Sequence, residues 1–168
     1  MLTSKPHRLK DFDYAGLHRY FLTFCTFQRQ PRFTMSDAVD LVLLQIQRAA
    51  HQDRFALIVY CFMPDHVHLL VQAQADDSDA RRFIRAVKQY SAFYFKQRFG
   101  QQLWQRYGFE RTLRDDEATL SVARYILENP VRARLVRNPE DYPFSGSSVH
   151  GVAEILEAVQ FRPDPRSG

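Results

Sequence analysis

Residues 55–73 restrict the fold of this chain more than any other segment. The runs 55–62 and 66–73 are rich in β-branched, aliphatic and aromatic residues, as β-strands are. Only Met63, Pro64 and Asp65 separate the two runs, and a proline in such a position breaks a strand. The sequence therefore predicts an antiparallel β-hairpin over this segment.

The flanking segments add two more strands and two helices. Residues 20–27 are a further run of aromatic and β-branched residues, and apolar residues then recur at helical spacing to about His51, with Ser36 or Asp37 as the cap. The acidic stretch 76–79 opens a long helix, which Gly100 ends. A fourth strand is expected somewhere within residues 104–114.

A last helix is expected to start near residue 115 and to end at Asn129, because Pro130 disfavours helical geometry in the residue before it. The order β-α-β-β-α-β with an additional C-terminal helix predicts an α+β fold with a ferredoxin-like antiparallel sheet. Such a sheet carries its two crossover helices on one face. The other face is left for a site or for the added helix.

A length of 168 residues, 45% of them hydrophobic, suits one domain. We expect a single domain over residues 1–168, with its core at about 18–148 and a flexible tail at about 160–168. No apolar run approaches the roughly 20 residues of a membrane span, and the first residues do not resemble a signal peptide, so a soluble cytoplasmic protein is expected. Cys25 and Cys61 lie in apolar runs, which excludes a disulfide framework and a cysteine zinc cluster.

Positive charge is concentrated in one segment, although the formal net charge is only +4. Between Arg81 and Arg114 there are nine basic residues and one acid, Glu110, with aromatic residues interleaved. Cations for phosphates beside rings for bases are typical of a nucleic-acid surface. A solvated helix face over an aromatic core would give the same composition, and this segment alone leaves both interpretations open.

Helical spacing divides the long helix into a packed face and a basic face. The packed face is expected to carry Phe83, Val87, Ser91, Tyr94 and Phe95. The basic face carries Arg81, Arg85, Lys88 and Lys96. One face is thus predicted to fill the core while the other is free to meet phosphates.

His66 and His68 form the sharpest local pattern. Side chains alternate along a strand, so both imidazoles point to one side while Val67 points to the other. Two unpaired histidines on a packed face would be costly, whereas one divalent cation satisfies a nitrogen of each ring. Two histidines hydrogen-bonded separately at a strand edge remain the alternative, since an isolated H-x-H pattern is only three residues long.

Tyr125 and Asn129 are four residues apart and share a face of the last helix. The buried stripe of that helix is expected to contain Leu120, Ala123 and Leu127, so the tyrosine and the asparagine project away from it. A nucleophile and an amide oxygen ligand would then lie together over the sheet. A surface tyrosine and a helix-ending asparagine would give the same pattern.

Longer motifs connect these patterns. They are MPDHVHLLV at 63–71, K-Q-Y-x-x-x-Y-F-x-x-R-F-G at 88–100, L-W-Q-R at 103–106, R-D-D-E at 114–117, R-Y-I-L-E-N-P-V-R-A-R-L-V at 124–136 and P-E-D-Y-P-F-S at 139–145. In this order and spacing, from about Tyr20 to Ser148, the chain closely resembles the REP-associated tyrosine transposases. They are a branch of the HUH single-tyrosine transposases of bacterial insertion sequences.

The resemblance implies roles for single residues. His66 and His68 correspond to the HUH metal ligands, Tyr125 to the catalytic tyrosine, and Asn129 to the polar residue that helps to hold the metal, expected to be Mg²⁺ or Mn²⁺. Tyr90 and Tyr94 compete as candidates, but their helical spacing favours a place in the core. Phe144 departs from relatives, which often have tryptophan there.

The resemblance also implies single-stranded DNA, often folded as a hairpin, as the substrate, and a monomer or homodimer as the active form. The residues expected to bind DNA are Arg81, Arg85, Lys88, Lys96, Arg111, Arg114, Arg132 and Arg134. The expected reaction is cutting and rejoining of DNA through a 5′-phosphotyrosine.

Two other functions fit the same scaffold. One is a domesticated protein that binds nucleic acid without cutting it, against which the presence of both histidines, the tyrosine and the asparagine argues. The other is a metal-dependent phosphodiesterase with water as the nucleophile, which would not need Tyr125.

Overall fold

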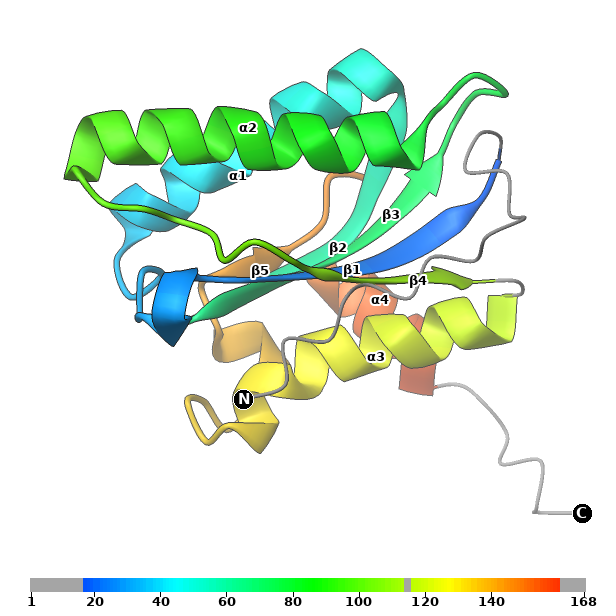
Figure 1. Cartoon of the computed structure of the whole chain (residues 1–168). Helices are drawn as coiled ribbons and strands as arrows, with labels where there is room; N and C mark the ends of the chain where they lie inside the picture. Colours follow the sequence, from blue (N-terminus) through cyan, green and yellow to red (C-terminus); the bar gives the residue numbers. More distant parts are fainter. Residues whose placement is uncertain (1–16, 114–115, 161–168) are drawn as a thin grey trace, which may run out of the picture.

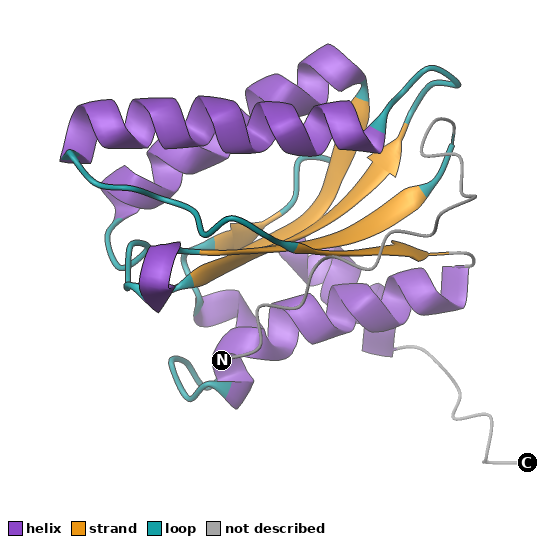
Figure 2. Ribbon diagram, viewed as in Figure 1, coloured by secondary structure: helices purple, strands orange, loops and turns teal. Residues whose placement is uncertain are grey.

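A five-stranded antiparallel sheet separates two layers of helices in the computed structural model, which describes residues 17–113 and 116–160. Helices α1 (Ser36–Asp53) and α2 (Ala80–Phe99) cover one face of the sheet. Helices α3 (Asp116–Arg132) and α4 (Val152–Gln160) lie on the other face (Figures 1 and 2). Within the described ranges, no helix is long and apolar enough to span a bilayer.

The strand order is β4-β1-β3-β2-β5. The strands are β1 (Arg19–Cys25), β2 (Phe55–Met63), β3 (His66–Ala73), β4 (Phe109–Leu113) and the short β5 (Ser145–Gly146). The first four give the order of a ferredoxin-like sheet, so the predicted fold is confirmed, and β2 and β3 form the predicted hairpin.

Because side chains alternate along β1 and β3, these strands contribute residues to two separate hydrophobic cores. Leu22, Val67 and Leu69 belong to the core under α1 and α2. Phe21 and Leu70 belong to the core under α3 and α4. Since neighbouring residues of a strand face opposite sides, His66 and His68 lie on the α3 side of the sheet.

The ends of α2 follow the chemistry expected from the sequence. The Asp79 carboxylate accepts hydrogen bonds from the backbone N–H groups of Arg81 and Arg82 at the first turn. Gly100 adopts a left-handed conformation with φ of 69°, which a glycine tolerates without steric cost, and the helix ends there. In α1, Ser36 is already the first helical residue and Met35 occupies the N-cap position without a side-chain hydrogen bond, so the expectation that Ser36 or Asp37 caps this helix was wrong.

Helix α3 ends later than predicted. It contains Pro130 and continues to Arg132, so the expectation that the helix ends at Asn129 was wrong. A proline close to a helix end removes one backbone donor and leaves most of the ladder intact. The backbone N–H of Leu135 then bonds to the Pro130 carbonyl at 2.9 Å.

The segment after residue 144 contains two elements that the sequence analysis did not predict, β5 and α4. Strand β5 pairs with β2 through Tyr60 and Cys61. Ile155 and Leu156 of α4 are buried in the core beneath α3. The tail predicted to be flexible lies, from residue 161 onward, outside the described residues.

Candidate metal and tyrosine site

The two histidines of the H-x-H pattern meet at the start of β3. Their Nε2 atoms are 3.2 Å apart, and their ring centroids are 4.7 Å apart. His68 is only 5% exposed, and His66 is half-buried. The structure thus brings both imidazoles together on the α3 face of the sheet, as the alternation of the strand predicts.

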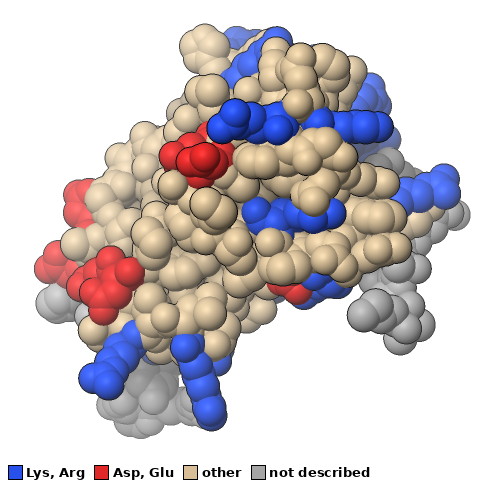
Figure 3. All heavy atoms as spheres, turned by 90° about the vertical axis from the view of Figure 1, so that its left-hand side faces the viewer, with Lys and Arg blue, Asp and Glu red and all other residues tan. Residues whose placement is uncertain are grey.

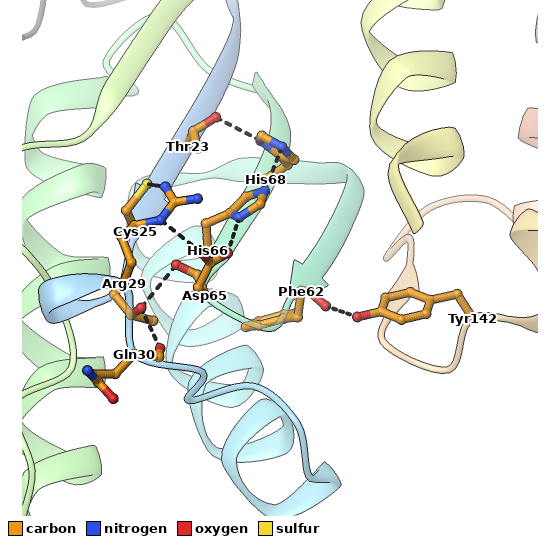
Figure 4. A network of polar contacts seen from close by, with 10 residues as sticks. Thr23, Cys25, Arg29, Gln30, Phe62, Asp65, His66, His68 and Tyr142 are labelled. Carbon is orange, nitrogen blue, oxygen red and sulfur yellow. Dashed lines mark hydrogen bonds and ion pairs between the residues drawn. The ribbon is translucent and has the colours of Figure 1, made fainter. Parts of the chain in front are cut away.

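The other ring nitrogen of each histidine is held by an oxygen (Figure 4). His66 Nδ1 lies 2.7 Å from the Asp65 carboxylate, and His68 Nδ1 lies 2.8 Å from the Thr23 hydroxyl. An ionised carboxylate can only accept, so the proton of His66 sits on Nδ1 and its Nε2 keeps a lone pair. A hydroxyl both donates and accepts, so His68 can present Nε2 either as a donor to His66 or as a lone pair.

Asp65 is itself fixed by the loop that follows β1. Arg29 donates from Nε to the Asp65 carboxylate at 2.9 Å (Figure 4). The backbone N–H of Thr26, which is fully buried, donates to the Asp65 carbonyl at 2.9 Å, and the Thr26 hydroxyl lies 2.7 Å from the Gln30 carbonyl and 3.0 Å from the Asp65 carbonyl. Burial alone would raise the pKa of the Asp65 carboxyl, but the hydrogen bond with His66 and the charge of Arg29 outweigh it and hold that pKa below its usual range.

Burial also determines the charge of the histidines. It lowers the pKa of His68 to about 3, and repulsion from a protonated His66 and from Arg132 and Arg29 acts in the same direction. It lowers the pKa of His66 as well, although Asp65 opposes the effect. Both rings are therefore neutral at pH 7, which is the form that binds metal ions.

A divalent cation fits this pair. Adjacent ligands around a six-coordinate cation with bonds of about 2.1 Å are roughly 3 Å apart, close to the spacing of the two Nε2 atoms. Partners on the far ring nitrogens are also what metal-binding histidines normally have. Among the described residues, no group of three histidine, cysteine or carboxylate side chains is placed to hold one metal ion, so Asp65 is a hydrogen-bond partner of His66 and not a third ligand. Further ligands would therefore be neutral oxygens, water or substrate.

Tyr125 lies beside His68 of the same chain. Its ring centroid is 5.8 Å from that of His68 and 6.0 Å from that of Phe21. The side chain is 47% exposed, whereas Ala123 and Leu127 are buried, as the helical spacing predicts. Tertiary structure thus brings a tyrosine from α3 to the second histidine of the H-x-H pattern on β3.

Asn129 is half-buried one turn after Tyr125 and on the same face of α3, as predicted. Its role as a metal ligand stays a prediction. Tyr94 was expected in the core but is 37% exposed, because Phe95 occupies the buried position of that turn of α2. Tyr90 is partly buried against the core, and its hydroxyl donates to Gln52.

Most of the basic residues expected to bind DNA lie in two groups. Arg81, Arg85 and Lys88 line a groove of about 310 Å³ between α2 and the segment before β4. Arg132 and Arg134 lie at the end of α3, on the opposite side of the sheet. Arg111 pairs with Phe21 and so faces the α3 side, Lys96 is exposed further along α2, and Arg114 lies outside the described residues.

Arg106 and Tyr107 form the far wall of the groove. The Arg106 carbonyl accepts a hydrogen bond from Lys88 at 3.3 Å. Gly108 lets this segment pass close to β1, since a Cβ there would lie 2.8 Å from the Thr23 carbonyl oxygen. Figure 3 shows the end of the molecule where β3 begins, with basic side chains spread over it and acidic ones gathered toward one side.

Three contacts of the site were not predicted. Asp65 stands next to His66 in the sequence, and that adjacency was an available signal. Thr23 has no local signal, because only the pairing of β1 with β3 brings it opposite His68. Arg29 likewise reaches Asp65 through the loop after β1, across 36 residues of sequence.

A comparison with models of protein families identifies the family of this chain. The model of the family described as "Transposase IS200 like" matches residues 15–129, more than half of the chain. The chain belongs to the IS200-like transposases. The resemblance to REP-associated tyrosine transposases seen in the sequence motifs is confirmed as well.

Individual proteins similar to this IS200-like transposase support the same family. A protein of Haemophilus influenzae, provisionally named a REP-associated tyrosine transposase, is 27% identical over 158 residues, which cover 87% of this chain and 88% of that protein. A solved REP-associated tyrosine transposase bound to a REP hairpin has the same fold, with a TM-score of 0.69, 20% identity and coverage of 94% and 93%. A provisionally named transposase of Deinococcus radiodurans has a TM-score of 0.51 at 25% identity, covering 73% of this chain and 97% of that one.

The buried histidines predict that the metal-free protein loses stability as the pH falls below neutral. In the unfolded chain an imidazole binds its proton near pH 6.5, whereas folded His68 does so only near pH 3. The unfolded state therefore binds more protons in this window, and stability declines as the pH drops through it, by up to about 1.4 kcal/mol per pH unit for His68.

Urea unfolding in EDTA between pH 7 and pH 5 measures this slope. His68→Gln, which cannot titrate, should show a shallower slope than the wild type. Equal slopes would mean that folded His68 takes up its proton as readily as the unfolded chain does.

Proposed function

We propose that this transposase cuts and rejoins single-stranded DNA through a covalent bond to Tyr125, with a divalent cation bound at His66 and His68. The observation that carries the proposal is the position of Tyr125. Tyr125 is half-exposed, and its ring centroid lies 5.8 Å from that of His68, a buried, neutral histidine of the same chain.

His66, His68 and Asn129 would hold the cation, Mg²⁺ or Mn²⁺. Nitrogen ligands together with amide, water and phosphate oxygens suit these ions. When bound, such a cation stabilises the charge that develops on the scissile phosphate and the leaving oxygen. Asp65 and Thr23 keep the two imidazoles oriented toward that position.

Tyr125 would supply the nucleophile. Its hydroxyl loses a proton, its oxygen forms a bond to phosphorus, and the bond from phosphorus to the 3′ oxygen breaks. The products are a 5′-phosphotyrosine and a free 3′-OH, which takes up a proton. Because the energy of the phosphodiester is kept in the new bond, another 3′-OH can attack and rejoin a strand while Tyr125 regains its proton.

Hairpin DNA is the substrate that the comparisons favour, since a solved relative is bound to a REP hairpin. In this chain, the groove between α2 and Arg106 offers guanidinium and ammonium groups for phosphates. It lies on the opposite face of the sheet from His68 and Tyr125. We infer that DNA held in the groove passes the β4 edge of the sheet to reach the tyrosine.

Tyr125→Phe tests the nucleophile. The substitution keeps the ring and its contacts with Phe21 and His68, so folding and DNA binding should be unchanged. Incubation with labelled hairpin DNA and Mn²⁺ should give a covalent protein–DNA adduct on a denaturing gel with the wild type. The adduct should fall by at least about a thousandfold in the variant and vanish with EDTA.

Tyr94→Phe is the matched control, because Tyr94 is also exposed but lies on α2 and should leave the adduct unchanged. Cleavage without an adduct in both the wild type and Tyr125→Phe would indicate water as the nucleophile. Binding of several hairpins without any cleavage would indicate a domesticated DNA-binding protein.

Arg85→Ala tests the groove. Loss of one phosphate contact should weaken hairpin binding and reduce the slope of log affinity against log salt by about one unit. Arg48→Ala is the control, because Arg48 stacks on Tyr90 outside the groove. If titrations over a range of salt concentrations give Arg85→Ala the affinity and slope of the wild type, the hairpin does not bind there.

A further inference from the structure

Arg132 contacts Tyr125, which the sequence analysis did not predict. Its guanidinium carbon lies 4.3 Å from the centre of the Tyr125 ring, and Nη2 donates to the Tyr125 backbone carbonyl at 2.5 Å. Seven residues are about two helical turns, and helical side chains lean toward the N-terminus. The long Arg132 side chain therefore reaches back along α3 to the tyrosine.

The position of Pro130 between these two residues adds to this contact. Proline has no N–H, so it cannot donate to the Ile126 carbonyl four residues earlier, and α3 lacks one backbone hydrogen bond at this level. The bond from Arg132 to the adjacent Tyr125 carbonyl links the last turn of the helix to the turn that carries the tyrosine.

Arg132 is also held by Glu128, and it shares the surroundings of the Tyr125 ring with Phe21 and His68. Its Nη1 lies 3.7 Å from a carboxylate oxygen of Glu128. Phe21 and His68 meet the Tyr125 ring at interplanar angles of 77° and 66°. Three elements thus surround a ring that is 47% exposed, and Arg132 is the neighbour that lies over its face.

We propose that Arg132 is a positioning residue for Tyr125, rather than only a contact for DNA phosphates. Its guanidinium stacks on the ring and keeps the hydroxyl on the side of the histidines. Without it, a half-exposed tyrosine on a helix surface can turn to other rotamers in solvent. This inference rests on the proposed function, because it assigns to Arg132 the orientation of the proposed nucleophile.

Arg132→Met tests the proposal kinetically. Methionine keeps an unbranched apolar side chain but lacks the charge, the plane and the donors. At saturating hairpin DNA with Mn²⁺, the single-turnover rate of adduct formation should fall roughly 10- to 100-fold, while the dissociation constant for the hairpin changes less than about threefold. Arg132→Lys should recover part of the rate, because an ammonium group also binds over an aromatic face.

Arg124→Met is the matched control. Arg124 lies on the same helix and pairs with the same Glu128 at 2.9 Å. Its loss removes a guanidinium from Glu128 but leaves Arg132 over the Tyr125 ring, so this variant should keep the wild-type rate. A loss in Arg132→Met that appears in the dissociation constant alone, with a reduced salt slope, would overturn the proposal and make Arg132 a phosphate contact. A wild-type rate in Arg132→Met would overturn it too.

A second measurement does not depend on activity. In protein labelled with 3-fluorotyrosine, the ¹⁹F resonance of Tyr125 is assigned by its loss in Tyr125→Phe. Removing the guanidinium from the ring face should shift this resonance in Arg132→Met and leave it in place in Arg124→Met. An unmoved resonance in Arg132→Met would overturn the proposal, whereas an absent adduct in the wild type with a shifted resonance would count against the proposed function alone.

Discussion

Pairing between β1 and β3 fixes both histidines and most of what touches them. Its register sets Thr23 opposite His68 and Cys25 opposite His66. The same ladder turns Phe21 toward α3, where its ring contacts both His68 and Tyr125. A shift by one residue would send these side chains to the other face of the sheet, so the register determines the site as well as the core.

The hairpin, the bounds of α2 and the direction of the histidines could all be predicted because each depends on local chemistry. Pro64 breaks the apolar run, Asp79 and Gly100 mark the ends of α2, and a period of two residues puts His66 and His68 on one side. These signals need no knowledge of distant residues.

Contacts between distant segments could not be predicted in the same way. The hydrogen bond between Thr23 and His68 joins residues that are 45 apart, and no feature of the TFCTF run marks it. Helix α4 was not predicted, because its apolar residues are buried only by contact with the core under α3, and the local sequence does not show that contact. For Tyr94, helical spacing alone did not decide which of two neighbouring rings, at 94 and 95, would be buried.

The two faces of the sheet have different roles in the proposed enzyme: the buried histidines on one face bind the cation, and the basic groove on the other binds DNA. The histidines are kept neutral by burial and oriented by Asp65 and Thr23. The groove beside α2 is open and basic, which suits a polyanion whose binding depends on counterion release. Because α3 brings Tyr125 and Arg132 to the histidines of the same chain, one chain carries the proposed nucleophile and metal ligands together.

The central claim is that His66 and His68 together bind one divalent cation, and pulsed EPR of the protein with Mn²⁺ tests it most directly. Labelling histidine with ¹⁵N identifies the nuclei coupled to the metal. The account predicts coupling to two histidine nitrogens in the wild type and to one in His68→Gln. Bound Mn²⁺ without histidine coupling, or the same coupling in the wild type and in His68→Gln, would contradict it.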